Sequence, residues 1–202
     1  MSDPQQARSV RSRQSLLDAG RELIGEVGID ELTLAEVARR AGLAVGTVYN
    51  RFTDKQHLIE EIVREWTGEV TAAFSLRRIT SEAADDGRAS LSALVGLFRE
   101  HRRFIRQIVM HSPLDPHIAA IVEPWLEEER AKLVGDLGRV TGSSERGAQL
   151  AALMTLATIE RAAVRLLSDE EWSRLEADLP AAGLEILMMD RPHRPALEAT
   201  EA

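Results

Sequence analysis

The sequence contains no cysteine, which excludes disulfide bonds, thiolate nucleophiles and cysteine-ligated zinc sites. Aromatic residues make up only 4% of the chain, and runs of β-branched residues are scarce. Alanine, leucine, glutamate and arginine are plentiful instead, and this composition favours helix over strand. The absence of disulfides also fits a reducing compartment. The composition therefore predicts an all-α protein.

Long apolar runs are missing as well. No segment approaches the roughly 18 consecutive apolar residues that a membrane span requires. The first residues, 1–6, are polar and lack the apolar core of a signal peptide. We therefore expect a cytoplasmic protein that has no membrane partner.

The net charge is −8, which at first sight argues against a nucleic-acid partner. The charge is unevenly distributed, however. Residues 1–55 carry eight Lys/Arg against eight Asp/Glu, and the remaining residues carry 17 basic against 25 acidic side chains. The whole acidic excess lies after residue 55, so the first segment permits DNA binding without demanding it.

Apolar residues recur at helical spacing from end to end, and no segment alternates as a half-buried strand does. A stripe between Val10 and Val27 predicts a first helix, which Gly28 is expected to end at a C′ position. Further helices are expected near 34–41, 45–52, 55–78, 88–102, 103–111, 116–139, 144–167 and 169–190, with a loop over 79–87.

Local signals refine these boundaries. Residues 33–36, 53–56 and 168–171 each fit a capping box, in which two residues three apart satisfy each other's backbone N–H groups. Pro124 and Pro180 fall inside helical patterns and are expected to kink or break their helices.

Two short helices separated by residues 41–44 match the helix-turn-helix unit, whose turn commonly contains glycine. One face of the second helix, Val45, Val48 and Phe52, is expected to pack on the first helix. The opposite face then carries groups that suit a major groove, a small residue beside a hydroxyl, an amide and a guanidinium. These outward residues are Gly46, Thr47, Asn50 and Arg51, with Tyr49 at the flank. Since two short helices with a glycine turn also occur in proteins that bind nothing, the pattern alone leaves the function open.

The residues of this region resemble the N-terminal signature of the TetR family of transcriptional regulators. The resemblance covers roughly residues 10–62 and rests on Leu32-Thr33-Leu34, Val37-Ala38, Ala41-Gly42, Gly46-Thr47-Val48-Tyr49-Asn50-Arg51-Phe52, Lys55 and Leu58. It implies a repressor that leaves a palindromic operator on double-stranded DNA when a small molecule binds the C-terminal domain. It also implies a homodimer.

The resemblance implies contacts by position. Thr33, Tyr49 and Lys55 would hold the phosphate backbone, and Gly46, Thr47 and Arg51 would lie nearest the base edges, beside Asn50. Leu34 and Ala35 would touch the groove wall. Arg51 suits either bidentate guanine recognition or a phosphate contact. Ala44 departs from the family pattern, in which serine often caps the recognition helix, and this puts one phosphate contact in doubt.

The resemblance divides the chain into a DNA-binding domain (1–55), a connecting helix (55–78) within a ligand-binding and dimerisation domain (56–190), and a flexible tail (191–202). A small-residue stripe, Ala148, Ala152, Leu156, Ile159, Ala163 and Leu166, is expected either to contact a second subunit or to pack within its own. The candidate ligand-binding residues, each also explicable as core, are Phe98, His101, Arg102, Phe104, Ile108, Trp125 and Met154. Their character predicts a mostly apolar effector whose polar group meets His101 or Arg102.

Two other functional classes compete with this interpretation. An enzyme is disfavoured because the chain has no phosphate-binding glycine loop, nucleophile elbow or His-Glu metal signature, and no cofactor is expected. The spacing of His101, His111 and His117 puts them on no common helix face, which disfavours a metal site. A helical protein-interaction module is favoured only by the acidic total charge.

Overall fold

The computed structural model describes residues 4–80, 86–141 and 144–189, and within these ranges it is entirely helical. The helices are α1 (Pro4–Val27), α2 (Leu34–Arg40), α3 (Val45–Tyr49), α4 (Lys55–Thr80), α5 (Asp86–Glu100), α6 (Arg102–His111), α7 (Pro116–Thr141), α8 (Glu145–Arg165) and α9 (Asp169–Met189). The predicted fold class is confirmed. The predicted tail over 191–202 lies outside the described residues.

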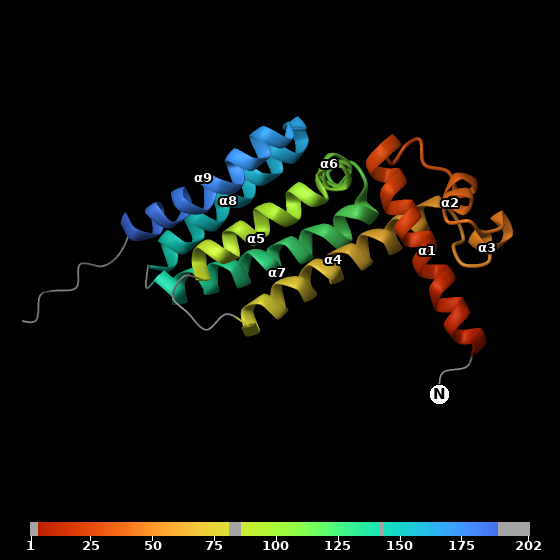
Figure 1. Cartoon of the computed structure of the whole chain (residues 1–202), viewed down its shortest axis with the longest axis horizontal. Coiled ribbons are helices and arrows are strands. Elements are labelled where there is room, and N and C mark those ends of the chain that lie inside the picture. Colours follow the sequence, from red (N-terminus) through yellow and green to blue (C-terminus); the bar gives the residue numbers. More distant parts are fainter. Residues whose placement is uncertain (1–3, 81–85, 142–143, 190–202) are drawn as a thin grey trace, which may run out of the picture.

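Helices α1 to α3 form a small unit at one end of the molecule, and α4 leads from this unit into a bundle of long helices (Figure 1). Helices α8 and α9 lie together on the side of the bundle away from α4. No helix of the described ranges combines the length and the apolar character needed to cross a bilayer.

Helix α4 packs against both parts of the molecule, because buried residues recur every four positions along one of its faces. Leu58 and Ile62 pack with α1, where the Cβ of any residue replacing Gly20 would lie 2.5 Å from Ile62 Cδ1. Further along, Trp66 stacks edge-on against Phe104 of α6, with ring centroids 5.5 Å apart. One continuous apolar cluster therefore joins the small unit to the bundle.

Several predicted boundaries are confirmed. Gly28 has φ +92° and donates its N–H to the Ile24 carbonyl at 3.1 Å, as expected of a C′ glycine. Ser168 and Glu171 form the complete capping box, with reciprocal hydrogen bonds of 2.7 and 3.3 Å. At Thr33 only half of the box forms, because the Glu36 carboxylate bonds to Arg39 instead.

Other predicted boundaries are wrong. The expected loop over 79–87 is helical at both ends, since α4 runs to Thr80 and α5 begins at Asp86. Helix α3 ends at Tyr49, three residues earlier than predicted. The cap of α4 is Asp54 rather than Thr53, because the Asp54 carboxylate accepts the His57 N–H at 2.7 Å.

The two prolines do not break their helices. Helix α7 continues through Pro124 and α9 through Pro180. A proline in a helix costs about 3 kcal/mol, and packing of the long flanking segments on neighbouring helices offsets that cost.

Candidate nucleic-acid interface

The turn between α2 and α3 is held by backbone geometry. Gly42 has φ +68°, and the Leu43 N–H donates to the Ala38 carbonyl at 2.9 Å. Val48 and Phe52 are buried together with Val37 of α2, as predicted, but Val45 is 43% exposed and does not join this packing. Because α2 holds α3 in a fixed orientation, α3 is able to enter the major groove of DNA as a recognition helix.

The outward face of α3 is open to solvent. No atom outside the local chain lies within 4 Å of the position that a Cβ on Gly46 would occupy. Tyr49 is 59% exposed, Asn50 is exposed and Thr47 is half-buried. The predicted base-contacting residues therefore share one accessible surface, although α3 lacks a side-chain cap because its N-cap residue is Ala44.

Thr33 caps α2 through its side chain, whose Oγ1 accepts the Glu36 N–H at 3.2 Å. A hydroxyl has one hydrogen and two lone pairs, so capping leaves the Thr33 hydrogen free to donate to a phosphate oxygen. Ala35, two residues further along the chain, is exposed. The side chain of Leu34 is buried in the core of the unit, which corrects the prediction that it touches the groove wall.

Arg51 and Lys55 each make a hydrogen bond within the unit that the sequence did not predict. Arg51 follows the end of α3, and its Nη2 donates to Ser9 Oγ of α1 at 3.1 Å. The Lys55 ammonium donates to the Asp30 carbonyl at 2.6 Å, which uses one of its three hydrogens. The guanidinium of Arg51 therefore points toward α1, so its geometry favours a phosphate contact over guanine recognition.

The basic residues of the first 55 fall into two groups. Arg13, Arg21, Arg39 and Arg40 each pair with a carboxylate. The Arg40 guanidinium, for example, lowers the pKa of Glu26. The other four make no ion pair with any carboxylate that the structure describes, and these are Arg8, Arg11, Arg51 and Lys55.

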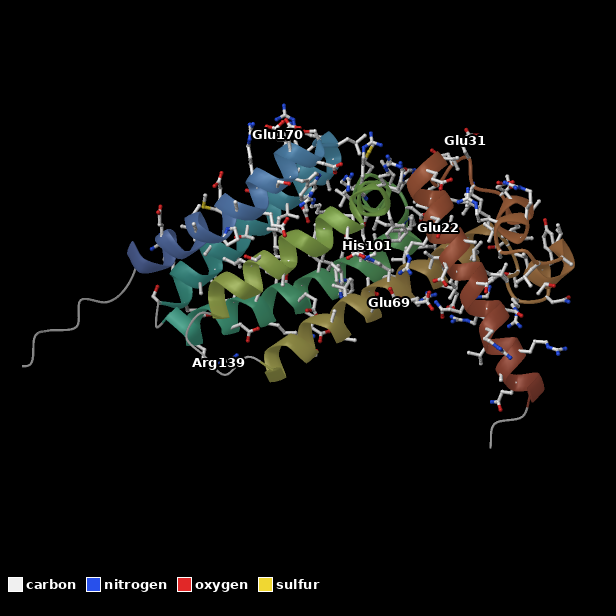
Figure 2. All side chains as sticks on the ribbon, in the orientation of Figure 1. Glu22, Glu31, Glu69, His101, Arg139 and Glu170 are labelled. Atoms are coloured by element: carbon white, nitrogen blue, oxygen red, sulfur yellow. The ribbon has the colours of Figure 1, made fainter. Side chains whose placement is uncertain are left out.

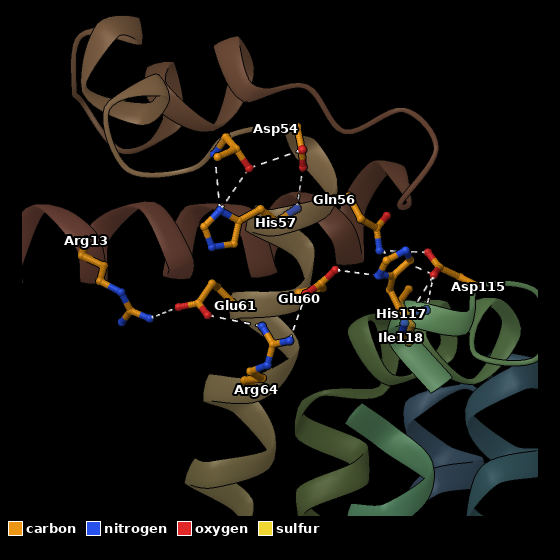
Figure 3. A network of polar contacts seen from close by, with 11 residues as sticks. Arg13, Asp54, Gln56, His57, Glu60, Glu61, Arg64, Asp115, His117 and Ile118 are labelled. Carbon is orange, nitrogen blue, oxygen red and sulfur yellow. Dashed lines mark hydrogen bonds and ion pairs between the residues drawn. The ribbon is translucent and has the colours of Figure 1, made fainter. Parts of the chain in front are cut away.

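A polar network joins this unit to the turn between α6 and α7 (Figure 3). Asp115 caps α7 by accepting the His117 N–H at 2.8 Å, and it also accepts from the Gln56 side chain at 3.2 Å. His117 Nδ1 lies 3.1 Å from the Glu60 carboxylate. Sequence patterns placed Gln56 only in a capping box and did not single out Glu60, because the partners of both residues are distant in the sequence.

The predicted ligand-binding residues are not all together. Phe98 and Ile108 are closed in the core, Trp125 donates its indole N–H to Thr71 Oγ1, and Met154 is 48% exposed on the outer face of α8. The remaining three, His101, Arg102 and Phe104, line one surface hollow of about 490 Å³ between α1 and α6. Figure 2 labels His101 and Glu22, which both border this hollow. Its lining is mainly charged rather than apolar, and burial lowers the pKa of His101.

Helix α8 has apolar residues on two faces. Ala148, Ala152, Ile159 and Ala163 of the small-residue stripe are fully buried, so these four pack within their own subunit, the second of the two alternatives, whereas Leu166 of that stripe is 51% exposed. Their small side chains allow close packing, since a Cβ on Gly138 of α7 would lie 3.9 Å from that of Ala148. The exposed face instead carries Leu150, Leu153 and Met154, which are 49, 55 and 48% exposed.

Comparison with known proteins agrees with this geometry. Residues 16–62 match the family model described as bacterial regulatory proteins, tetR family. The HTH-type transcriptional regulator BetI of Escherichia coli O139:H28 is 38% identical over 89 residues, which cover 44% of this chain and 45% of BetI. The chain thus aligns with less than half the length of this curated relative.

Solved structures extend the likeness of the fold to the bundle. A TetR-family transcriptional regulator from Mesorhizobium loti superposes with a TM-score of 0.73 at 22% identity, covering 90% of this chain and 98% of that one. FadR from Bacillus subtilis, solved with stearoyl-CoA, gives 0.56 at 20% identity and covers 87 and 96%. Residues 16–62 therefore match the helix-turn-helix segment of the tetR family of bacterial regulatory proteins, and the helices around them share the fold of the solved structures.

Proposed function

We propose that the chain is a sequence-specific DNA-binding regulator, a repressor that occupies a palindromic operator as a homodimer. The observation that carries this proposal is the open face of α3, bordered by Arg51 and Lys55, which no described carboxylate neutralises. An uncompensated cation beside an exposed recognition helix attracts phosphate and lets the helix settle in the major groove. The match of residues 16–62 to the family model supports a regulator over an enzyme or a protein-interaction module.

We assign base contacts to the outward face formed by α3 and its C-cap residue Asn50, and backbone contacts to the residues that border this face. Thr47 and Asn50, with Gly46 allowing close approach, face the base edges. Thr33, Ala35, Tyr49 and Lys55 surround them, and Arg51 joins this backbone group because of its bond to Ser9.

The test is selection of DNA from a random pool, followed by fluorescence anisotropy on the selected duplex and a scrambled one. Thr47→Ala/Asn50→Ala should lower affinity for the selected duplex only, since each good base contact discriminates by about 1–3 kcal/mol. Arg51→Ala should weaken both duplexes equally. Arg174→Ala, on α9, is the control and should change neither. Equal affinity of the wild-type protein for both duplexes would refute sequence-specific binding.

We infer that the exposed face of α8 forms the subunit interface. Three large apolar side chains about half-exposed on one helix face, Leu150, Leu153 and Met154, are costly in water and suit an isologous contact with a second copy. The two recognition helices of such a dimer would meet successive major grooves about 34–36 Å apart, or a multiple of that distance.

Leu153→Asp tests this interface by placing a charge in the middle of the apolar face. Sedimentation should report a monomer, with loss of binding to the palindrome. Leu114→Asp is the matched control, because Leu114 is 81% exposed before α7 and away from that face. A Leu153→Asp variant that remains dimeric would exclude this face as the interface.

Regulation by a small molecule is the remaining part of the proposal. The hollow lined by His101, Arg102 and Phe104 also includes Arg21 and Glu22 of α1, so an occupant would touch both the DNA-binding unit and the bundle. Its charged lining favours an effector with a charged group over the mostly apolar one that the sequence suggested. FadR of Bacillus subtilis was solved with stearoyl-CoA, which has both an acyl chain and anionic groups and is a reasonable first probe.

Calorimetric titration of stearoyl-CoA with and without operator tests the coupling. Reciprocity requires that operator weaken ligand binding by the same factor by which ligand weakens operator binding, about 5- to 150-fold for a coupling of 1–3 kcal/mol. Equal ligand affinity with and without operator would show that ligand binding does not regulate DNA binding.

A further inference from the structure

The first turns of α1 extend beyond the core of the small unit. The first fully buried residue of the helix is Leu16, whereas Arg8, Val10 and Arg11 are exposed, Val10 by 63%. Such a length of helix without buried apolar residues adds little stability to the unit. In Figure 1 this end of α1 projects from the same end of the molecule as α3.

Ion pairs hold α1 against α4 where the two helices cross. Arg13 pairs with Glu61 at 2.5 Å and Arg21 with Glu69 at 2.5 Å. Arg8 and Arg11 precede Arg13 and flank Ser9, whose hydroxyl contacts Arg51. Arg51 comes shortly before Lys55, which begins α4 and is a predicted phosphate contact.

The projecting segment is basic and uncompensated. Between Pro4 and Leu17 the sequence has three arginines and no aspartate or glutamate. Arg13 is neutralised by Glu61, and Arg11 Nε donates only to the Ala7 carbonyl of its own helix, at 3.3 Å. Neither Arg8 nor Arg11 meets a carboxylate in the ranges that the structure describes.

The hydrogen bond between Arg51 and Ser9 indicates where the beginning of α1 would lie when α3 occupies the major groove of DNA. Helix α3 has five residues and is therefore about 7.5 Å long, and the major groove is about 12 Å wide. An element in contact with the end of such a helix meets the sugar-phosphate strand that borders the groove. Ser9 makes that contact at 3.1 Å, between Arg8 and Arg11 in the sequence.

We propose that Arg8 and Arg11 bind phosphates of the strand bordering the operator's major groove, a contact outside the helix-turn-helix. The proposal rests on the DNA-binding function proposed above. Because phosphates carry no sequence information, these arginines add affinity and salt dependence without changing the preferred sequence.

The double variant Arg8→Gln/Arg11→Gln tests the contact by anisotropy over a range of salt concentrations. Each lost phosphate contact lowers the slope of log affinity against log salt by about 0.9, so the slope should fall by about 1.8. If affinities converge near 1 M salt, that slope difference weakens binding about 60-fold at 0.1 M. The ratio of affinities for selected and scrambled duplexes should not change, and Arg8→Lys/Arg11→Lys should largely retain the wild-type slope.

Arg139→Gln/Arg174→Gln is the matched control, since it removes the same charge from exposed arginines of the bundle (Figure 2 labels Arg139 and Glu170, the partner of Arg174). Its salt slope should equal that of the wild type. Wild-type protein without salt-dependent DNA binding would refute the proposed function itself. Wild-type binding with an unchanged slope in Arg8→Gln/Arg11→Gln would overturn only this inference.

Discussion

The turn that follows α1 determines where α2 and the recognition helix begin, and Gly28→Ala tests it. Gly28 has φ +92°, a conformation that alanine adopts at a cost of about 1–3 kcal/mol. A Cβ there would also lie 3.3 Å from Gln107 Oε1, the end of a flexible side chain that is able to move. Alanine restricts the unfolded chain and returns about 0.4–1 kcal/mol. The net loss expected for Gly28→Ala is about 1–2 kcal/mol of unfolding free energy.

Gly68→Ala is the matched comparison because the two substitutions add the same methyl group. Gly68 lies exposed inside α4, and nothing approaches within 4 Å of the added Cβ. Its replacement should stabilise the protein by about 1 kcal/mol through helix propensity. The two variants should therefore differ by about 2–3 kcal/mol in opposite directions from the wild type.

Urea denaturation at one fixed protein concentration measures both effects, since the stability of the proposed dimer would depend on concentration. Melting temperatures should move in parallel, by about 2–4 °C for each kcal/mol in a chain of this size. Gly28→Asn should be milder than Gly28→Ala, because asparagine tolerates positive φ better. A Gly28→Ala protein as stable as the wild type would refute the argument from backbone conformation.

Three further predictions follow from caps, burial and charge. Thr33→Ala should lower the unfolding free energy by about 1 kcal/mol in urea, because α2 loses its side-chain cap. Burial raises the pKa of Glu160, so the stability linked to its protonated form is complete below the ordinary value of 4.5 and is lost as pH rises through the folded-state pKa. Glu160→Gln should therefore be more stable than wild type at pH 7, with the difference shrinking toward pH 4; a constant difference would contradict this. Lys55→Gln should reduce the slope of log DNA affinity against log salt concentration by about 0.9. An unchanged slope would show that Lys55 contacts no phosphate and only hydrogen-bonds the Asp30 carbonyl.

The small N-terminal unit was predictable because its signals are local. Gly28 and Gly42 both adopt positive φ at turns, and Thr33 caps the helix that follows it. Each of these features depends on residues within four positions, which a sequence pattern can register. Arg51 was harder to interpret because its partner Ser9 lies 42 positions away.

The bundle was less predictable because both faces of α8 are apolar in sequence. Ala152 and Ile159 turn inward, and Leu150 and Leu153 turn outward. A helical period identifies a stripe but does not say which of two stripes meets the subunit's own core. Small side chains face inward because α8 packs closely on α7 and α9.

The prediction of a loop over 79–87 was wrong because Asp86 and Gly87 are typical turn residues, whereas here they lie in the first turn of α5.

The contacts between the two parts of the molecule are of a size that permits regulation. Asp115 holds both the first turn of α7 and Gln56 of α4, while His111 Nε2 lies 3.5 Å from the Asp30 carboxylate in the turn that also binds Lys55. Exposed polar pairs of this kind contribute roughly 0.2–1 kcal/mol each. A shift of the turn between α6 and α7 that breaks two or three of them therefore supplies about 0.4–3 kcal/mol, a range that overlaps the 1–3 kcal/mol that ligand coupling needs. Because Gln56 and Lys55 are neighbours at the start of α4, the same shift reaches the DNA-binding surface directly.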